Sequence, residues 1–278
     1  MKVVKVEDQT GPRFKAFGVN PFIETLKNQF STFAIDVDTA SFTLTRNYIS
    51  KGVLPPAEAV RTEEFVNFFD YAYKAPEGDT FKVYAQVAPS KFGHGLQMMK
   101  IGVKGKRLGR EEKRKAVLTF LVDTSGSMDT ADRLGLVKKS LKILVEKLAP
   151  EDKIAIVQYD SRARLVLDHT AVSDKKKILA AVDSLQCSGS TNLEDGMEKA
   201  YQVAARNFLS KGENRVLLLS DGAANLGSLA ADEVLKKVEE YRKQGILCSV
   251  FGVGIGTYDD TMLEALANKG DGTYAFLD

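Results

Sequence analysis

From about residue 115 onward, short apolar runs alternate with segments that have helical periodicity. The run 117–122 is almost wholly apolar, which is typical of a central parallel strand covered on both faces. Apolar residues then recur at helical spacing over 134–148, and Pro150 ends that helix. This alternation predicts an α/β fold: a doubly wound, mainly parallel sheet with helices on both of its faces.

The same periodicity places each element of this region. We expect strands at 117–122, 153–159, 164–167, 215–219, 246–253 and 272–276, with helices over 134–148, 178–185, 193–208, 228–242 and 262–267. Only the turn at Asp160-Ser161 separates the second and third strands, so these two are expected to pair as an antiparallel hairpin.

The first 114 residues follow a different pattern, which predicts a smaller α+β region. The apolar run 32–37 is expected to be a strand, and Asp38 or Thr39 is suited to cap the helix that follows it. Pro55 and its neighbouring proline end that helix, and a second helix is predicted over 57–71.

Two further segments of this region, 80–87 and 97–103, alternate between apolar and polar residues as antiparallel strands do. A charged stretch follows at 104–115. We therefore place a boundary in that stretch, between an N-terminal region, 1–114, and a second domain, 115–278.

The charge pattern argues against nucleic-acid binding and against a membrane-spanning segment. The 39 basic and 37 acidic residues leave a net charge of only +2. Glu111 and Glu112 interrupt the one dense basic run, which we interpret as a solvated connector. No stretch approaches ~18 consecutive apolar residues. The N-terminus has no apolar signal core, but the mature part of an exported protein would look the same.

Cysteine and histidine offer few routes to other chemistry. Cys187 and Cys248 are the only cysteines, which excludes a disulfide framework and favours two reduced, structural thiols. His94 and His169 have no recognisable serine or cysteine partner, and two histidines make a zinc site improbable. No catalytic residue is therefore predicted.

Hydroxyl and acidic side chains gather where several predicted elements end. Asp123, Ser125 and Ser127 directly follow the strand 117–122, Asp221 follows the strand 215–219, and Thr191 lies in a turn before a helix. In an open α/β sheet, ligands bind beyond the carboxyl ends of the strands. Two carboxylates and three hydroxyls form an all-oxygen site that suits a hard divalent cation, Mg²⁺ above all, with Mn²⁺ and Ca²⁺ as alternatives.

Each of these residues also has a purely structural interpretation. Ser127 or Asp129 could cap the helix that follows, and Thr191 or Asn192 could cap the next one. Asp221, followed by glycine, could be only a turn residue. The combination of all three motifs at matching strand ends favours the metal site.

The three motifs together resemble those of a known family. Asp123-Thr-Ser-Gly-Ser127, Ser190-Thr191-Asn-Leu and Ser220-Asp221-Gly look like the metal-ion-dependent adhesion site of von Willebrand factor A domains. The resemblance covers roughly residues 115–278 and implies a six-stranded, Rossmann-like fold with a protein-binding role. It implies hydroxyl ligands at Ser125, Ser127 and Thr191, and carboxylates at Asp123 and Asp221 that bind directly or through water.

The N-terminal region has a narrower resemblance. The segments 31–41 and 61–70, with Leu54-Pro-Pro-Ala between them, are similar to the part that precedes the A domain in bacterial YfbK-like proteins. Those proteins often carry a lipoprotein or secretory leader and continue into a further C-terminal region. The resemblance implies a cell-envelope protein, periplasmic or lipid-anchored, with a cytoplasmic location as the alternative.

The function expected from these observations is divalent-cation-dependent protein binding, in which Mg²⁺ coordinates an Asp or Glu side chain of a partner protein. Two alternatives use the same fold: a metal-dependent hydrolase or phosphotransferase, and a metal-independent scaffold for an ATPase or envelope complex. The hydrolase lacks an obvious general base. We expect the rim of the site to include Tyr159, Asp160, Ser188, Asn225 and Tyr258.

Overall fold

The structure is a computed structural model, which describes residues 14, 18, 20–32, 37–109, 113–222, 228–254 and 260–278. It divides into two compact units. One comprises Met1–Phe68 together with Lys115–Asp278, and the other comprises Phe69–Arg114. The division into domains 1–114 and 115–278 stays a prediction. The compact units place the first 68 residues together with residues 115–278.

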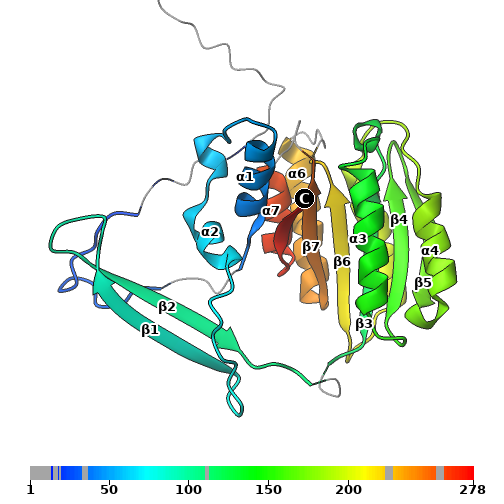
Figure 1. The fold of residues 1–278 in the computed structure, drawn as a ribbon. Coiled ribbons are helices and arrows are strands. Elements are labelled where there is room, and N and C mark those ends of the chain that lie inside the picture. Colours follow the sequence, from blue (N-terminus) through cyan, green and yellow to red (C-terminus); the bar gives the residue numbers. More distant parts are fainter. Residues whose placement is uncertain are drawn as a thin grey trace, which may run out of the picture. The chain divides into compact units, whose positions relative to one another are not determined.

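A six-stranded sheet forms the centre of the larger unit, and it confirms the predicted fold class (Figure 1). The strand order is β5-β4-β3-β6-β7-β8, in which only β5 runs antiparallel to its neighbour. The strands are β3 (Ala116–Asp123), β4 (Lys153–Tyr159), β5 (Ala163–Ala171), β6 (Glu213–Ser220), β7 (Ile246–Val253) and β8 (Tyr274–Leu277). The hairpin of β4 and β5 is as predicted, although β5 is longer than expected.

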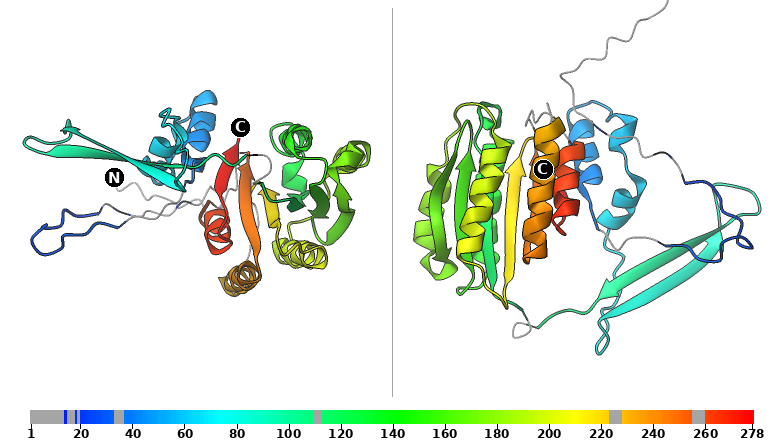
Figure 2. Two further views of the ribbon diagram at one scale, coloured as in Figure 1. Left: turned by 90° about the horizontal axis from the view of Figure 1, so that it is seen from below. Right: turned by 180° about the vertical axis from the view of Figure 1, so that it is seen from behind.

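Helices cover both faces of this sheet (Figure 2). Side chains alternate along β3, so Phe120 and Val122 pack with α3 and α4, whereas Leu121 packs with α5, α6 and α7 on the other face. The helices are α3 (Leu134–Lys147), α4 (Lys175–Ser184), α5 (Leu193–Arg206), α6 (Ser228–Lys243) and α7 (Asp260–Lys269). Helix α5 ends two residues earlier than the periodicity predicts.

Three short helices of the N-terminal segment also belong to the larger unit: α1 (Ala40–Ser50), η1 (Ala57–Ala59) and α2 (Thr62–Phe68). The single helix predicted over 57–71 is therefore wrong, because the chain makes a short turn of 3₁₀-helix before α2 begins. Apolar side chains of this segment, including Leu44 and Tyr48, join the same core cluster as Tyr274 and Phe276 of β8.

The N-terminal segment covers the outer edge of β8 with polar side chains. Thr43 Oγ1 donates to the carbonyl of Phe276 (3.1 Å), and the Tyr274 N–H donates to Asp38 Oδ1 (2.8 Å). Both backbone groups belong to alternate residues of an edge strand, where they would otherwise lack a neighbouring strand. Residues far apart in the sequence therefore complete the sheet at this edge.

The start of α1 differs from the prediction. Thr39 occupies the N-cap position without a side-chain cap, and the Ser41 N–H donates instead to the Glu64 carboxylate (2.7 Å). Glu64 supplies the acceptor from α2, so a tertiary contact replaces a local one. The predicted strand at 32–37 falls largely on residues 33–36, which lie outside the described part of the chain.

The smaller unit contains the predicted antiparallel pair, β1 (Phe81–Pro89) and β2 (Gln97–Gly105). Tyr73 stacks on Tyr84 of β1, with ring centroids 4.8 Å apart. A Cβ atom at Gly102 would lie within 2.4 Å of the Tyr73 ring, so only glycine fits beneath that aromatic ring.

Candidate metal centre

The candidate site lies at the carboxyl ends of β3 and β6, which are direct neighbours in the sheet. Val122 pairs with Leu219, so Asp123 and Ser220 end these strands side by side, and Asp221 follows immediately. The sequence places these acids at matching strand ends, and the parallel register brings the two ends together.

Asp123 is completely buried, and both of its carboxylate oxygens accept hydrogen bonds. Oδ1 accepts from the Ser125 N–H (2.9 Å), while Oδ2 accepts from Ser220 Oγ (2.8 Å) and from the Tyr159 hydroxyl (3.2 Å). Burial raises the pKa of Asp123, the bonds from Ser125 and Ser220 oppose that shift, and the nearby charge of Asp221 adds to it. This carboxylate therefore lies at the floor of the site.

Tyr159 supports that floor from β4. Its side chain is fully buried, so it lies beneath Asp123 and does not line the predicted rim. Burial raises the pKa of Tyr159 well above its ordinary value, and the charge of Asp123 raises it further. The phenol thus remains a neutral donor to Asp123. The predicted rim residues Asn225 and Tyr258 lie outside the described part of the chain.

The two serines of the first motif present their hydroxyls to one another. A 3₁₀ turn, η2 (Gly126–Met128), follows Ser125, and the Oγ atoms of Ser125 and Ser127 lie 3.1 Å apart. Two adjacent ligands of an octahedral Mg²⁺, each at 2.0–2.1 Å, would be about 3 Å apart. The spacing of these hydroxyls therefore fits one small, hard cation, with the Asp123 carboxylate behind them.

Backbone hydrogen bonds hold the loop of Thr191 against the loop of Ser125. The Ser188 N–H donates to the Thr124 carbonyl (2.8 Å), and the Gly126 N–H donates to the Gly189 carbonyl (3.1 Å). Gly189 has φ +67°, and a Cβ atom there would lie 2.4 Å from Ser161 Oγ, so this turn requires glycine. These bonds bring Thr191 to the same edge of the sheet.

Asn192 has the structural role that the sequence left open between it and Thr191. Its side chain caps α5 by accepting from the Asp195 N–H (3.1 Å), and its own N–H donates to the Asp160 carbonyl (2.8 Å). The partly buried Thr191 is therefore not needed as the cap.

Asp160, one of the predicted rim residues, braces this loop from the end of β4. Its Oδ2 accepts from Ser188 Oγ (2.8 Å) and from Arg164. Burial alone would raise the pKa of Asp160, but the bonds from Ser188, from the Arg162 N–H and from Arg164 lower it. Asp160 consequently stays ionised and acts on the loop as a fixed acceptor.

Arg133 is a member of the site that motif reasoning missed. Its Nη1 donates to Asp221 Oδ2 (2.7 Å) and to the Ser127 carbonyl (2.5 Å). The residue directly precedes α3 and lies outside all three motifs, so no sequence signal marks it. It connects Asp221 with the turn that carries the serine hydroxyls.

A cation site in this cluster would need ligands other than carboxylates, imidazoles and thiols alone. Within the described residues, no three His, Cys, Asp or Glu side chains come together in a way that could hold a metal ion. The hydroxyls of Ser125 and Ser127 lie beside the two carboxylates and could supply such oxygen ligands. Hard, oxygen-seeking cations such as Mg²⁺ match such a donor set.

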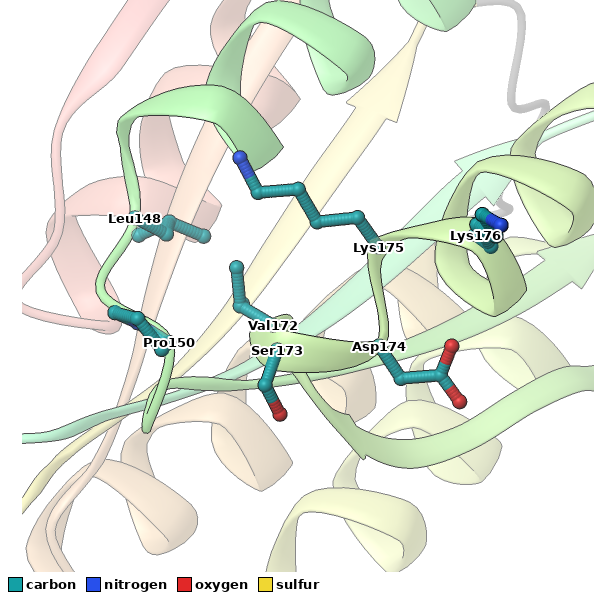
Figure 3. Close-up of a pocket in the computed structure, with 7 residues that line it drawn as sticks. All are labelled: Leu148, Pro150, Val172, Ser173, Asp174, Lys175 and Lys176. Carbon is teal, nitrogen blue, oxygen red and sulfur yellow. The ribbon is translucent and has the colours of Figure 1, made fainter.

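A surface pocket lies away from this site, where α3 leads into β4 and where α4 begins (Figure 3). Its lining includes none of the candidate metal ligands. Leu148, Pro150 and Val172 form its apolar part, where α3 leads into β4. Asp174 caps α4 through the Lys177 N–H (3.3 Å), and Lys175 pairs with Glu146 (2.6 Å). The two charged groups Asp174 and Lys175 are therefore engaged in structural contacts.

Comparison with known proteins identifies the family of this fold. The model of the von Willebrand factor type A domain matches residues 118–278, which carry the whole six-stranded sheet beyond the first residues of β3. The chain belongs to the von Willebrand factor type A family. A second family model, described as von Willebrand factor, matches residues 8–100. Type A domains are typically metal-dependent protein-interaction modules.

Curated relatives extend the similarity to the N-terminal segment. The chain is 37% identical to YfbK of Escherichia coli (strain K12) over 285 residues, which cover 100% of this chain and 50% of that protein. It is 24% identical to sll0103 of Synechocystis over 66% of this chain and 42% of that protein. This type A chain thus spans about half the length, or less, of these relatives. The predicted whole-chain resemblance to YfbK-like proteins is confirmed.

Two solved structures show the same fold. A von Willebrand factor type A protein from Catenulispora acidiphila has a TM-score of 0.53 and 15% identity, covering 76% of this chain and 48% of that one. The protein BatB from Bacteroides thetaiotaomicron has a TM-score of 0.51 and 19% identity, covering 59% of this chain and 90% of that one. No described helix of the present type A chain combines the length and apolar character needed to span a membrane.

Proposed function

We propose that the chain is a divalent-cation-dependent protein-binding module. In this proposal Ser125, Ser127 and Thr191 hold Mg²⁺ through their hydroxyls, with Asp123 and Asp221 acting directly or through water. The observation that carries it is the 3.1 Å separation of the two serine hydroxyls in front of the buried Asp123 carboxylate. Mn²⁺ and Ca²⁺ are alternative cations.

The proposed site contains residues that orient the carboxylate and residues that would bind the cation. Tyr159 and Ser220 orient Asp123 by donating to its Oδ2, so this carboxylate supplies negative charge from a fixed position. The hydroxyls are neutral, so the ligand set leaves a dication only partly neutralised. A bound Mg²⁺ would supply a positively charged coordination position, and an acidic side chain from a partner protein is the group best suited to it.

The proposed role is binding and not catalysis. Asp123 accepts three hydrogen bonds and Asp221 is paired with Arg133, so neither carboxylate is placed as a general base. We further propose, from the resemblance to YfbK-like proteins, that the module acts in the bacterial cell envelope as part of a lipid-anchored or periplasmic protein.

Calorimetric titration with MgCl₂ tests the cation site. We expect Mg²⁺ binding by the wild type and its loss in Ser125→Ala, while Ser173→Ala in the distant pocket binds as the wild type does. Failure of the wild type to bind Mg²⁺, Mn²⁺ or Ca²⁺ would refute the proposal.

Affinity capture from a bacterial envelope extract tests the partner. Proteins retained in Mg²⁺ should elute with a chelator and should not be retained by Asp123→Ala. Equal retention by both proteins would instead identify a metal-independent scaffold. Mg²⁺-dependent turnover in a phosphoester screen would identify the enzyme alternative.

A further inference from the structure

Arg133 places a permanent positive charge inside the proposed cation site. Its Nη1 contacts Asp221 Oδ2 at 2.7 Å and the Ser127 carbonyl at 2.5 Å. Only 17% of the Arg133 side chain and 2% of the Asp221 side chain are exposed. The ion pair is therefore largely shielded from water, where a charge interaction is stronger than at the surface.

The Arg133 side chain packs directly against the backbone at Gly254. Gly254, which follows β7, has φ +69°, and a Cβ atom built there would lie 2.5 Å from Arg133 Nε and 2.8 Å from its Cγ. Any other residue at 254 would thus displace the arginine. The side chain therefore lies between Gly254, which follows β7, Asp221, which follows β6, and the Ser127 carbonyl of η2.

The arginine and a divalent cation would serve the same electrostatic purpose. Asp123 and Asp221 are two carboxylates at neighbouring strand ends, and the charge of Asp221 disfavours the ionised form of the buried Asp123. The Arg133 guanidinium offsets this repulsion through Asp221. A dication bound to the serine hydroxyls would offset it too, and it would be repelled by the arginine.

We propose that Arg133 is an internal competitor for the cation: it stabilises the fold when no divalent ion is bound, and it weakens the affinity of the site for such an ion. This inference rests on the proposed function. It implies that binding of the cation and movement of the Arg133 side chain are coupled, so that the site fills only at elevated cation concentration.

The test compares the wild type with Arg133→Gln in the full chain, by MgCl₂ calorimetry and by thermal unfolding in EDTA and in saturating Mg²⁺. We expect Arg133→Gln to bind Mg²⁺ about tenfold more tightly, to unfold at a lower temperature in EDTA and to gain more from Mg²⁺. Arg242→Gln is the matched control, because it removes one positive charge from a surface pair with Asp271. Its Mg²⁺ affinity should equal that of the wild type.

The outcomes separate this inference from the proposed function. If the wild type binds Mg²⁺ and Arg133→Gln binds with equal or lower affinity, the competitor role is refuted and the binding module stands. If neither protein binds a divalent cation, both are refuted.

A measurement on the wild type guards against a variant that does not fold. The Nε–Hε resonance of Arg133 in ¹⁵N spectra should shift as Mg²⁺ fills the site. Saturation with Mg²⁺ that leaves this resonance unchanged would refute the competitor role.

Discussion

Arg61, just before α2, and Asp260, the first residue of α7, form a buried ion pair although 199 positions separate them in the sequence. Arg61 Nη2 lies 3.5 Å from Asp260 Oδ1, and the Tyr274 hydroxyl donates to that same oxygen (2.6 Å). Arg61 also donates to Glu64, the acceptor that caps the start of α1. One arginine thus connects the N-terminal helices with α7.

Arg61→Met is expected to lower the free energy of unfolding by about 3–5 kcal/mol, because it leaves the buried carboxylates of Glu64 and Asp260 without a cation. Urea unfolding measures the change. Lys243→Met is the control: it breaks an exposed pair with Glu239 and should change the stability far less. Equal costs for the two variants would contradict the importance of the buried pair.

A chain shortened to residues 115–278 is expected to unfold at a lower temperature and to associate as its concentration rises. Removal of Asp38 and Thr43 takes away the groups that bond the outer edge of β8, and removal of α1 takes Leu44 and Tyr48 from the core. Calorimetry and sedimentation measure both effects. A monomeric fragment with unchanged thermal stability would show that the N-terminal helices are dispensable.

Folding stability should fall as the pH is lowered from about 6.5 to about 4, in part because of His169. Burial lowers the pKa of this side chain to about 4, so the unfolded chain takes up a proton that the folded chain does not. His169→Gln should remove roughly 2 kcal/mol of this pH dependence. A pH dependence in His169→Gln equal to that of the wild type would contradict this role of the buried imidazole.

Gly196→Ala should destabilise the protein by roughly 1–3 kcal/mol, despite the higher helix propensity of alanine. A Cβ atom at this position of α5 would lie 2.9 Å from Tyr159 Cγ, and Tyr159 donates to Asp123. Urea unfolding measures the stability, and Mg²⁺ calorimetry should show weaker binding. A more stable variant would mean that Tyr159 moves without cost.

Thr191→Ala should affect Mg²⁺ affinity, whereas Asn192→Ala should affect folding stability. On the proposed function, loss of the Thr191 hydroxyl weakens Mg²⁺ binding at least tenfold with little change in stability. Loss of the Asn192 cap should lower stability by about 1 kcal/mol and leave Mg²⁺ affinity nearly unchanged. Calorimetry and thermal unfolding of both variants decide the matter, and equal Mg²⁺ affinities would remove Thr191 from the ligand set.

The core of the fold was predictable because its signals are local. The apolar run of β3 and the periodicity of α3 each lie within one short stretch, and the topology follows from their alternation. The helical capping at α1 was not predictable in this way. Glu64 reaches Ser41 across 23 positions of sequence, and no local pattern encodes that contact.

In the candidate site, too, some residues were predictable from local sequence and one was not. Asp123, Ser125 and Ser127 lie in one motif, and strand register explains their approach to Asp221. Arg133 is different, because its place beside Asp221 depends on the turn that follows Ser127 and on the space left by Gly254. Only three-dimensional packing reveals such a residue.

The coverage of β8 by Asp38 and Thr43 limits how this sheet can recognise other polypeptides. Many complexes form by β-augmentation, in which an extended peptide adds itself as a further strand. At β8, the Tyr274 N–H and the Phe276 carbonyl are already bonded within the chain. A peptide that adds a strand to this sheet would therefore have to pair with β5, the other edge strand.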